Sequence, residues 1–291
     1  MTETHGRLNG KVAVVTGGTK GIGQGIVLRF LKEGASVVYC SRSPENNVDN
    51  EKLIAAIPGA AERARFVAAD VGNRQQMEDL VHGAAERFGR LDIVVNNAQG
   101  IAPVRSIEDK PDADYAMTLA TGFYQSLWTT RAAVPHMRKV GGGRLIYFSS
   151  HWNIWGQPFA SDYNITKSAN EALTRSAARE FGKDNITANC ITPAGDSWAY
   201  KSWADQNRAM ADASVQQFPM RRMGDCEVDI AGAVLGLVSD NGRFITGQIF
   251  CVDGGVWATA PLQQHEEGTD IHRGHSQTAT ALDVDIEGLP A

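Results

Sequence analysis

The chain has 291 residues, a formal net charge of -5 and 43% hydrophobic residues, values typical of a globular protein that folds without disulfides or metal. The negative charge disfavours nucleic-acid binding, which needs a basic face. No run of about 18 apolar residues predicts a membrane span, and the first ten residues lack the apolar core of a signal peptide, so we expect a cytoplasmic protein.

Strand-like and helix-like segments alternate along most of the chain. Short β-branched runs predict strands, and apolar residues three and four apart predict helices. The predicted strands are 11–16, 36–40, 65–69, 91–95, 144–149, 185–192 and 248–252. The predicted helices are 21–33, 74–88, 112–138, 161–182, 198–217 and 227–238. This alternation predicts an α/β fold, a doubly wound Rossmann-type domain with a seven-stranded, mostly parallel sheet and helices on both faces.

One domain is expected over residues 1–258, with residues 194–220 or so forming a lid over the substrate. Residues 259–291 lose apolar periodicity and are mainly polar, which predicts an extended or disordered tail. The four cysteines have no CxxC spacing, and we expect them to be buried small apolar residues. We expect no structural or catalytic metal, because no histidine has ligand partners at a typical spacing.

A glycine-rich turn joins the first predicted strand to the first helix. Residues 16–23 read TGGTKGIG, with glycines at 17, 21 and 23. Without Cβ atoms the backbone can approach a pyrophosphate, and the helix start offers free N–H groups and partial positive charge. The spacing is not GxGxxG, and a turn without a ligand is the alternative. Its place at the first strand–helix junction favours a dinucleotide.

The end of the second predicted strand indicates which dinucleotide is bound. An NAD site usually has an acidic residue here, and this chain has none at 40–42. The guanidinium of Arg42 and the hydroxyls of Ser41 and Ser43 suit a 2′-phosphate, and Lys20 could add a second charge. We therefore predict NADP(H) over NAD(H). The alternative is that Arg42 and Lys20 are solvated surface charges.

Three polar residues near the fifth strand suggest acid–base chemistry. Tyr163 and Lys167 are four residues apart at the start of a predicted helix and share one face. The lysine cation favours the phenolate form of the tyrosine, as catalysis near neutral pH requires. Ser150 lies thirteen residues before Tyr163, at a strand end. A chance YxxxK and a simple turn are the alternatives, and joint placement at the carboxyl ends of strands favours a site.

Together these motifs resemble those of the short-chain dehydrogenase/reductase family. The resemblance runs from about Leu8 to Trp257. It implies an NADP(H)-dependent oxidoreductase that interconverts a carbonyl and a secondary alcohol, assembled as a homodimer or homotetramer. Besides the turn and the Tyr–Lys pair, it rests on Asp70-Val71, Asn96-Asn97-Ala98, Thr246-Gly247-Gln248 and Val252-Asp253-Gly254-Gly255.

The resemblance assigns roles to individual side chains. Tyr163 would exchange the proton with the substrate oxygen, Lys167 would tune Tyr163 and bind the nicotinamide ribose, and Ser150 would orient the substrate. Asp70 would bind the adenine amino group, with a helix N-cap as the alternative. The expected cofactor-binding residues are Gly17, Thr19, Lys20, Gly21, Ile22, Gly23, Ser41, Arg42, Ser43, Asp70, Val71, Asn97, Ala98, Gln99, Tyr163, Lys167, Pro193 and Gly195.

The chain departs from the family's pattern near the expected nicotinamide. Leu119 stands where the family carries a catalytic asparagine, which leaves the proton relay unassigned, and Gln99 stands where the family has glycine. These two residues favour an alternative from another class, a nucleotide-binding sensor or scaffold of the same fold with weak or no turnover.

Aromatic residues gather in the two segments that enclose the substrate in this family. They predict a bulky aromatic or alicyclic substrate. The alternative is that they pack the segment after the sixth strand onto the core. The candidate substrate residues are His151, Trp152, Trp155, Trp198 and Trp203.

Overall fold

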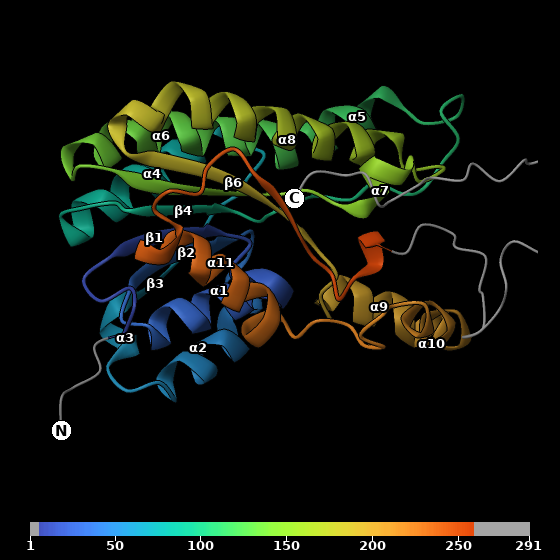
Figure 1. Cartoon of the computed structure of the whole chain (residues 1–291), viewed down its shortest axis with the longest axis horizontal. Helices are drawn as coiled ribbons and strands as arrows, with labels where there is room; N and C mark the ends of the chain where they lie inside the picture. Colours follow the sequence, from blue (N-terminus) through green and yellow to red (C-terminus); the bar gives the residue numbers. More distant parts are fainter. Residues whose placement is uncertain (1–5, 259–291) are drawn as a thin grey trace, which may run out of the picture.

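The computed structural model describes residues 6–258, in which seven parallel strands form one sheet with helices on both faces (Figure 1). The strand order is β3-β2-β1-β4-β5-β6-β7, and every neighbouring pair is parallel. The predicted fold class is confirmed. The predicted tail, 259–291, lies outside the described residues. The strands are β1 (Val12–Thr16), β2 (Ser36–Ser41), β3 (Ala64–Ala68), β4 (Ile93–Asn96), β5 (Gly143–Phe148), β6 (Ile186–Pro193) and β7 (Ile249–Val252).

The helices form two layers on either side of the sheet (Figure 1). One layer contains α1 (Gly21–Lys32), α2 (Val48–Ala55), α3 (Ala60–Arg63) and α11 (Ala231–Val238). The other contains α4 (Arg74–Phe88), α5 (Asp112–Leu119), α6 (Gln125–Lys139) and α8 (Ser161–Phe181). Three further helices, α7 (His151–Trp155), α9 (Trp198–Gln206) and α10 (Arg208–Gln216), lie beyond the carboxyl ends of the strands.

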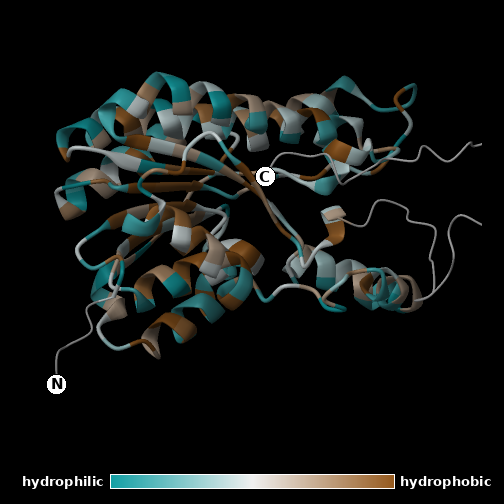
Figure 2. Cartoon of the chain, viewed as in Figure 1, coloured by the Kyte–Doolittle hydropathy of each residue, from teal (hydrophilic) through white to brown (hydrophobic). Residues whose placement is uncertain are grey.

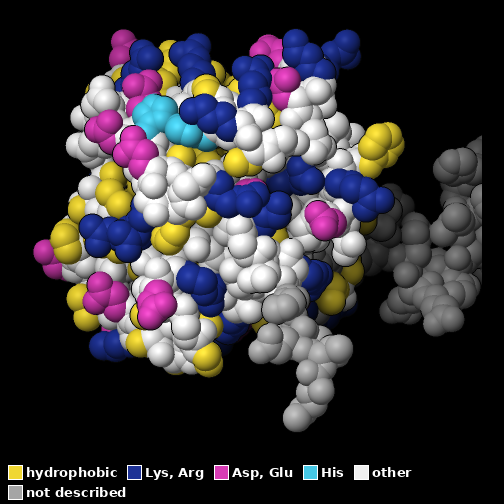
Figure 3. All heavy atoms as spheres, turned by 90° about the vertical axis from the view of Figure 1, so that its left-hand side faces the viewer, with side chains coloured by type: hydrophobic (Ala, Val, Ile, Leu, Met, Phe, Trp, Pro, Cys, Tyr) yellow, Lys and Arg dark blue, Asp and Glu magenta, His cyan; other side chains and the backbone are white. Residues whose placement is uncertain are grey.

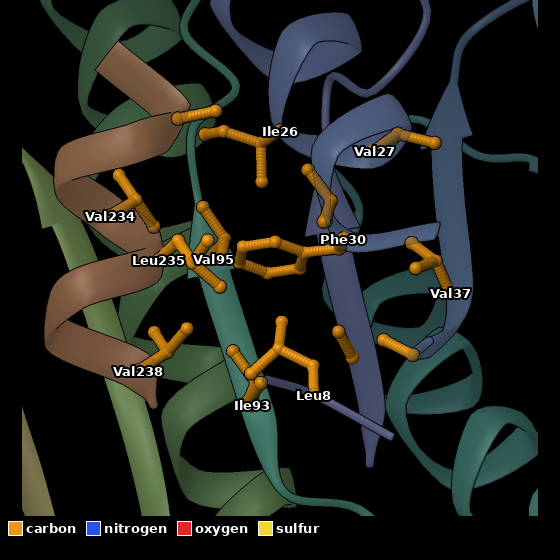
Figure 4. Close-up of a cluster of buried hydrophobic side chains, with 14 of the residues drawn as sticks. Leu8, Ile26, Val27, Phe30, Val37, Ile93, Val95, Val234, Leu235 and Val238 are labelled. Atoms are coloured by element: carbon orange, nitrogen blue, oxygen red, sulfur yellow. The ribbon is translucent and has the colours of Figure 1, made fainter. Parts of the chain in front are cut away.

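Each face of the sheet has its own hydrophobic core. In Figure 4 the ring of Phe30 from α1 points toward Leu235 of α11 and toward the β4 side chains Val95 and Ile93, all at most 1% exposed. Val94 belongs to the core on the other face, because successive strand residues point to opposite sides. Burying side chains of this size contributes about 1.5–3 kcal/mol each. The two cores fix the sheet that positions the site.

Hydropathy follows the layers. Figure 2 shows hydrophobic strands between helices whose outer surfaces are largely hydrophilic. Figure 3 shows the face at the amino ends of the strands, where Lys and Arg side chains are interspersed with acidic ones. None of the helices in residues 6–258 is both long enough and apolar enough to cross a membrane.

The structure divides three helices that were predicted to be continuous. The predicted helix 112–138 is interrupted by a π-helical turn at Ala120–Tyr124, and 198–217 is split at Asn207. The predicted helix 227–238 likewise begins with a π-helical turn, Cys226–Ile230. A π-turn adds one residue without changing the apolar pattern on either side, so periodicity did not reveal it.

The prediction that all cysteines are buried is partly wrong. Cys40 and Cys190 are buried in the sheet, where burial raises the pKa of Cys40 to about 11 and that of Cys190 to about 12. Cys226 is half-buried, and Cys251 is exposed because it lies on the edge strand β7. Only one side of an edge strand is covered by a neighbour.

Candidate active site

A cavity of about 700 Å³ lies at the carboxyl ends of the strands. The chain passes from β1 outward to β3 and then returns to β4 on the other side of β1, which makes this point the topological switch of the sheet. Ligands of open parallel sheets bind at this point. The walls of the cavity come from the β1–α1 turn, the ends of β2 and β4, the start of α8 and the start of α9.

The glycine turn is held open by its own backbone and by β4. Gly17 has φ +67°, which favours glycine, and a Cβ at Gly23 would lie 2.1 Å from the Gly17 carbonyl oxygen. The amide of Asn97 donates to the carbonyl oxygens of Thr16 and Gly17, at 3.0 and 3.3 Å. The Thr16 hydroxyl accepts the N–H groups of Asn97 and Ala98, both at 3.1 Å. The turn therefore presents fixed backbone to the cavity.

The basic end of the cavity lies beyond β2. Arg42 is exposed and lines the cavity, and no carboxylate pairs with it within residues 6–258. The Ser41 hydroxyl donates to the Ser43 carbonyl oxygen at 3.2 Å. The ammonium of Lys20 lies 4.9 Å from the ring centroid of Trp198, so it joins the glycine turn to the start of α9. Arg42 and Lys20 thus place two cations on the cavity wall, and such groups suit an anionic group of a ligand.

The Asp70 carboxylate stabilises the turn after β3 but does not cap α4. It accepts the N–H of Gly72 at 2.9 Å, whereas the helix N-cap is Asn73, whose side chain accepts the N–H of Gln76. The N-cap interpretation of Asp70 is therefore wrong. Asp70 and Val71 both line the cavity.

Tyr163 and Lys167 lie together on the wall formed by α8. The Lys167 side chain is buried, its ammonium donates to the Phe148 carbonyl oxygen at 3.2 Å, and it lies 5.3 Å from the ring centroid of Tyr163. The ring of Trp152 meets that of Tyr163 edge-on, with centroids 5.6 Å apart. The phenol and the ammonium thus face one cavity from successive turns of one helix.

Two adjacent serines at the end of β5 are placed differently. Ser149 lines the cavity, but its one hydroxyl hydrogen is shared between the carboxylate of Glu171 and the Asn153 side-chain oxygen. Ser150 is the N-cap of α7, where its hydroxyl oxygen accepts the N–H of Trp152 at 3.2 Å. Ser150 is not one of the residues that line the cavity. Its hydroxyl hydrogen is not used by this capping bond.

Four of the five candidate substrate residues lie off the cavity wall, and only Trp198 is part of it. The buried imidazole of His151 pairs with the carboxylate of Asp253 at 2.7 Å, and the ring of Trp155 lies beside His151. Trp152 reaches the site only through Tyr163, and Trp203 packs against Tyr200.

Most of the predicted cofactor residues come together on the cavity wall. Gly23, Ser43 and Gly195 do not line it. Gly23 instead allows the chain to pack closely against the Gly17 carbonyl, and Gly195 packs in the same way against Ile22. The prediction missed several lining residues, most of them in loops or beside the π-turn. In these segments the spacing of apolar residues does not indicate which side chains face the cavity. They are Asn46, Ala69, Gly72, Gly100, Ile101, Met117, Ala120, Thr121, Phe148, Ser149, Ser197 and Ala199.

Comparison with known proteins places the chain among oxidoreductases. Residues 17–257 match the family model described as Enoyl-(Acyl carrier protein) reductase. A 7alpha-hydroxysteroid dehydrogenase from Clostridium sardiniense is 35% identical over 259 residues, covering 88% of this chain and 96% of the relative.

Two solved structures share the fold. The structure titled ElxO with NADP bound has a TM-score of 0.78 and 28% identity, covering 85% of this chain and 99% of that one. A short-chain type dehydrogenase/reductase from Mycobacterium ulcerans has a TM-score of 0.80 and 26% identity, covering 86% of this chain and 91% of that one.

Proposed function

We propose, because the chain belongs to the short-chain dehydrogenase/reductase family of oxidoreductases, that it interconverts a carbonyl and a secondary alcohol with NADP(H) as hydride carrier. One observation carries this proposal. Tyr163 and Lys167 line the same cavity as the glycine turn, so an acid–base pair lies beside a backbone suited to a dinucleotide.

The cavity residues fit NADP(H) in chemical terms. The turn at Gly17 and the start of α1 suit a pyrophosphate, because backbone N–H groups and the helix dipole attract anions. Arg42 and Lys20 would hold the 2′-phosphate, since no acidic residue lines the end of β2. The ElxO structure, which has NADP bound, supports the same preference.

The reaction needs a proton as well as a hydride, and the cofactor supplies or accepts the hydride when bound. In reduction the Tyr163 hydroxyl would give its proton to the substrate oxygen, and in oxidation the phenolate would take it back. The Lys167 ammonium stabilises that phenolate by its charge. Ser150 would donate a hydrogen bond to the same oxygen as negative charge develops on it.

A bulky alicyclic or aromatic substrate suits the mouth of the cavity. Trp198 and Ile101 line it and are 58% and 59% exposed, and Met117 lines it from α5. Apolar walls with few polar groups favour a ligand of large apolar area. The relative from Clostridium sardiniense is named for a hydroxysteroid, which supports including ring ketones of that size among the substrates tested.

The experiment is a two-step assay on the purified protein. Binding of NADPH and NADH is followed by fluorescence, and turnover is then measured on a panel of aromatic, alicyclic and steroid ketones. We expect tighter binding of NADPH, turnover of a ring ketone, and a fall in kcat of at least about 100-fold in Tyr163→Phe with NADPH binding retained. Preference for NADH, or turnover that survives Tyr163→Phe, would refute the proposal.

The alternative is a nucleotide-binding sensor, favoured by Leu119 with its apolar side chain beside the π-turn. NADPH binding without turnover of any ketone in the panel would support this alternative.

A further inference from the structure

The side chain of Gln99 carries a buried acceptor that the rest of the described chain does not use. Gln99 follows β4 and lines the cavity together with Tyr163 and Lys167. Its amide nitrogen donates to the carbonyl oxygens of Gly100, at 2.8 Å, and Thr118, at 3.3 Å. Its Oε1 is buried and has no donor within hydrogen-bond distance in residues 6–258.

The orientation of this amide is fixed by its neighbours. Both partners of the nitrogen are carbonyl oxygens, which only accept hydrogen bonds. Rotating the amide by half a turn would place Oε1 against two acceptors, so the oxygen must occupy the unpartnered position. Leaving a buried acceptor unpaired costs about 1–3 kcal/mol, and such groups are ordinarily satisfied by a water or ligand.

Gly122 makes room for that oxygen. A Cβ at this position would lie 2.2 Å from Oε1 of Gln99 and 2.3 Å from the Thr166 methyl group. Gly122 lies in the π-helical turn between α5 and α6, and Thr166 directly precedes Lys167 on α8. The unpartnered oxygen therefore points between the π-turn and the helix that carries Tyr163 and Lys167.

The Lys167 ammonium, by contrast, has hydrogen-bond donors without acceptors. Lys167 is 4% exposed as a residue, and its ammonium has three N–H donors, of which the Phe148 carbonyl accepts one in the described part of the chain. A buried ammonium needs further acceptors, because the lost hydration is costly. The same cavity thus has donors in excess at Lys167 and an acceptor in excess at Gln99. A water molecule lying between these two groups would satisfy both.

We infer that Gln99 is a positioning residue for proton transfer, holding through Oε1 a water that also binds the Lys167 ammonium. This inference rests on the proposed function. Each reduction adds one hydride and one proton to the carbonyl. The proton comes from the Tyr163 hydroxyl, which becomes a phenolate. The phenolate regains a proton through the Lys167 ammonium and this water, and the water is reprotonated from solvent. The net uptake is one proton from solvent in each turnover.

Gln99→Met and Gln99→Glu provide the kinetic test. Methionine keeps the length of the side chain but removes the acceptor, and glutamate keeps acceptor oxygens. We expect Gln99→Met to lower kcat at least about tenfold and to increase the solvent isotope effect on kcat, with KM and the NADPH Kd within about twofold. Gln99→Glu should recover kcat only as the pH falls, because the protonated acid can donate to the Gly100 or Thr118 carbonyl while its other oxygen accepts from the water.

Gln125→Met is the matched control. Gln125 is also buried, its Oε1 also lacks a partner in residues 6–258, and it adjoins the same π-turn, but it does not line the cavity. Its loss should lower stability without changing the solvent isotope effect. The inference is wrong if Gln99→Met keeps the wild-type kcat and isotope effect, if it only raises the NADPH Kd, or if Gln99→Glu stays as slow as Gln99→Met at a pH where its carboxyl group is protonated.

A crystal structure of the NADPH complex tests the inference independently of turnover. We expect an ordered water bonded to Oε1 of Gln99 and linked to Lys167, and its loss in Gln99→Met. A cofactor or substrate atom bonded to Oε1 instead, or an Oε1 without any partner, would overturn it. NADPH binding with that water present but no turnover of any ketone would refute the proposed function alone.

Discussion

The ammonium of Lys110 lies 2.6 Å from the carboxylate of Asp162, and the two side chains are 0% and 2% exposed. Lys110 also donates to the Pro103 carbonyl oxygen at 3.0 Å. Asp162 directly precedes Tyr163, so this buried ion pair joins the loop before α5 to the start of α8. The position of the proposed acid–base group depends on a contact between segments 52 residues apart.

Lys110→Met should destabilise the fold strongly. It leaves the Asp162 charge buried without its partner, which costs about 3–5 kcal/mol. Urea unfolding followed by circular dichroism measures the loss, and Lys110→Met combined with Asp162→Leu should recover much of it, because no unpaired charge then remains. Lys52→Met is the control, since the Lys52–Asp49 pair is 72% and 87% exposed and should contribute at most about 1 kcal/mol. Equal losses in Lys110→Met and Lys52→Met would contradict the argument.

Ser150 and Ser149 should differ in their effect on turnover. The Ser149 hydroxyl is committed to Glu171 and Asn153, whereas the Ser150 hydroxyl retains a free hydrogen for the substrate oxygen. We expect Ser150→Ala to lower kcat by about 100-fold or more, and Ser149→Ala by much less. Steady-state kinetics on the best ketone of the panel compares them. The opposite order would move the role to Ser149, which lines the cavity.

The fold and the Tyr–Lys pair were predictable because their signals are local. Strands buried on both faces, such as β4, appear as unbroken β-branched runs, and Tyr163 and Lys167 share a helix face by spacing alone. The Lys110–Asp162 pair has no such signal, because only the folded chain brings the two residues together.

The unpredicted part of the cavity has a similar cause. Met117 and Thr121 belong to a helix that was predicted as regular, and the π-turn between α5 and α6 changes which side chains face the cavity. Ile101 and Gly100 lie in a loop without periodicity. The sequence pattern places His151 among the candidate substrate residues, but in the folded chain its ring pairs with Asp253.

Arg42→Glu should reverse the cofactor preference. The variant removes a guanidinium that would bind the 2′-phosphate and adds a carboxylate suited to a ribose hydroxyl. Charge-assisted hydrogen bonds of about 1.5–3 kcal/mol predict an NADPH affinity lower by about 10- to 100-fold, with NADH binding kept or improved. Fluorescence titration measures both, and Arg243→Glu, an equal charge change at an exposed site off the cavity, is the control. Unchanged NADPH affinity in Arg42→Glu would show that Arg42 is only a surface charge.

Asp92 should make stability depend on pH at the end of the sheet opposite the cavity. Its carboxylate, 8% exposed, accepts two hydrogen bonds from Arg90 and the N–H of Val12 at 2.9 Å, and Lys11 lies 3.4 Å away. This end of the sheet is the face shown in Figure 3, where Lys and Arg side chains are interspersed with acidic ones. Burial alone would raise the pKa of Asp92, but the hydrogen bonds and the two cations outweigh it and hold the pKa below its ordinary value.

A lowered pKa in the folded state gives stability that is fully present above the unfolded pKa and is lost as pH falls through the folded one. Asp92→Asn should therefore unfold more easily than the wild type at pH 7, by about 1–3 kcal/mol, and the difference should shrink between about pH 5 and pH 2. Urea unfolding at several pH values measures it. Asp49→Asn, whose carboxylate is 87% exposed, should show almost no such difference. A gap that stays constant with pH would mean that Asp92 stabilises by packing, since its charge would then contribute nothing to the pH dependence.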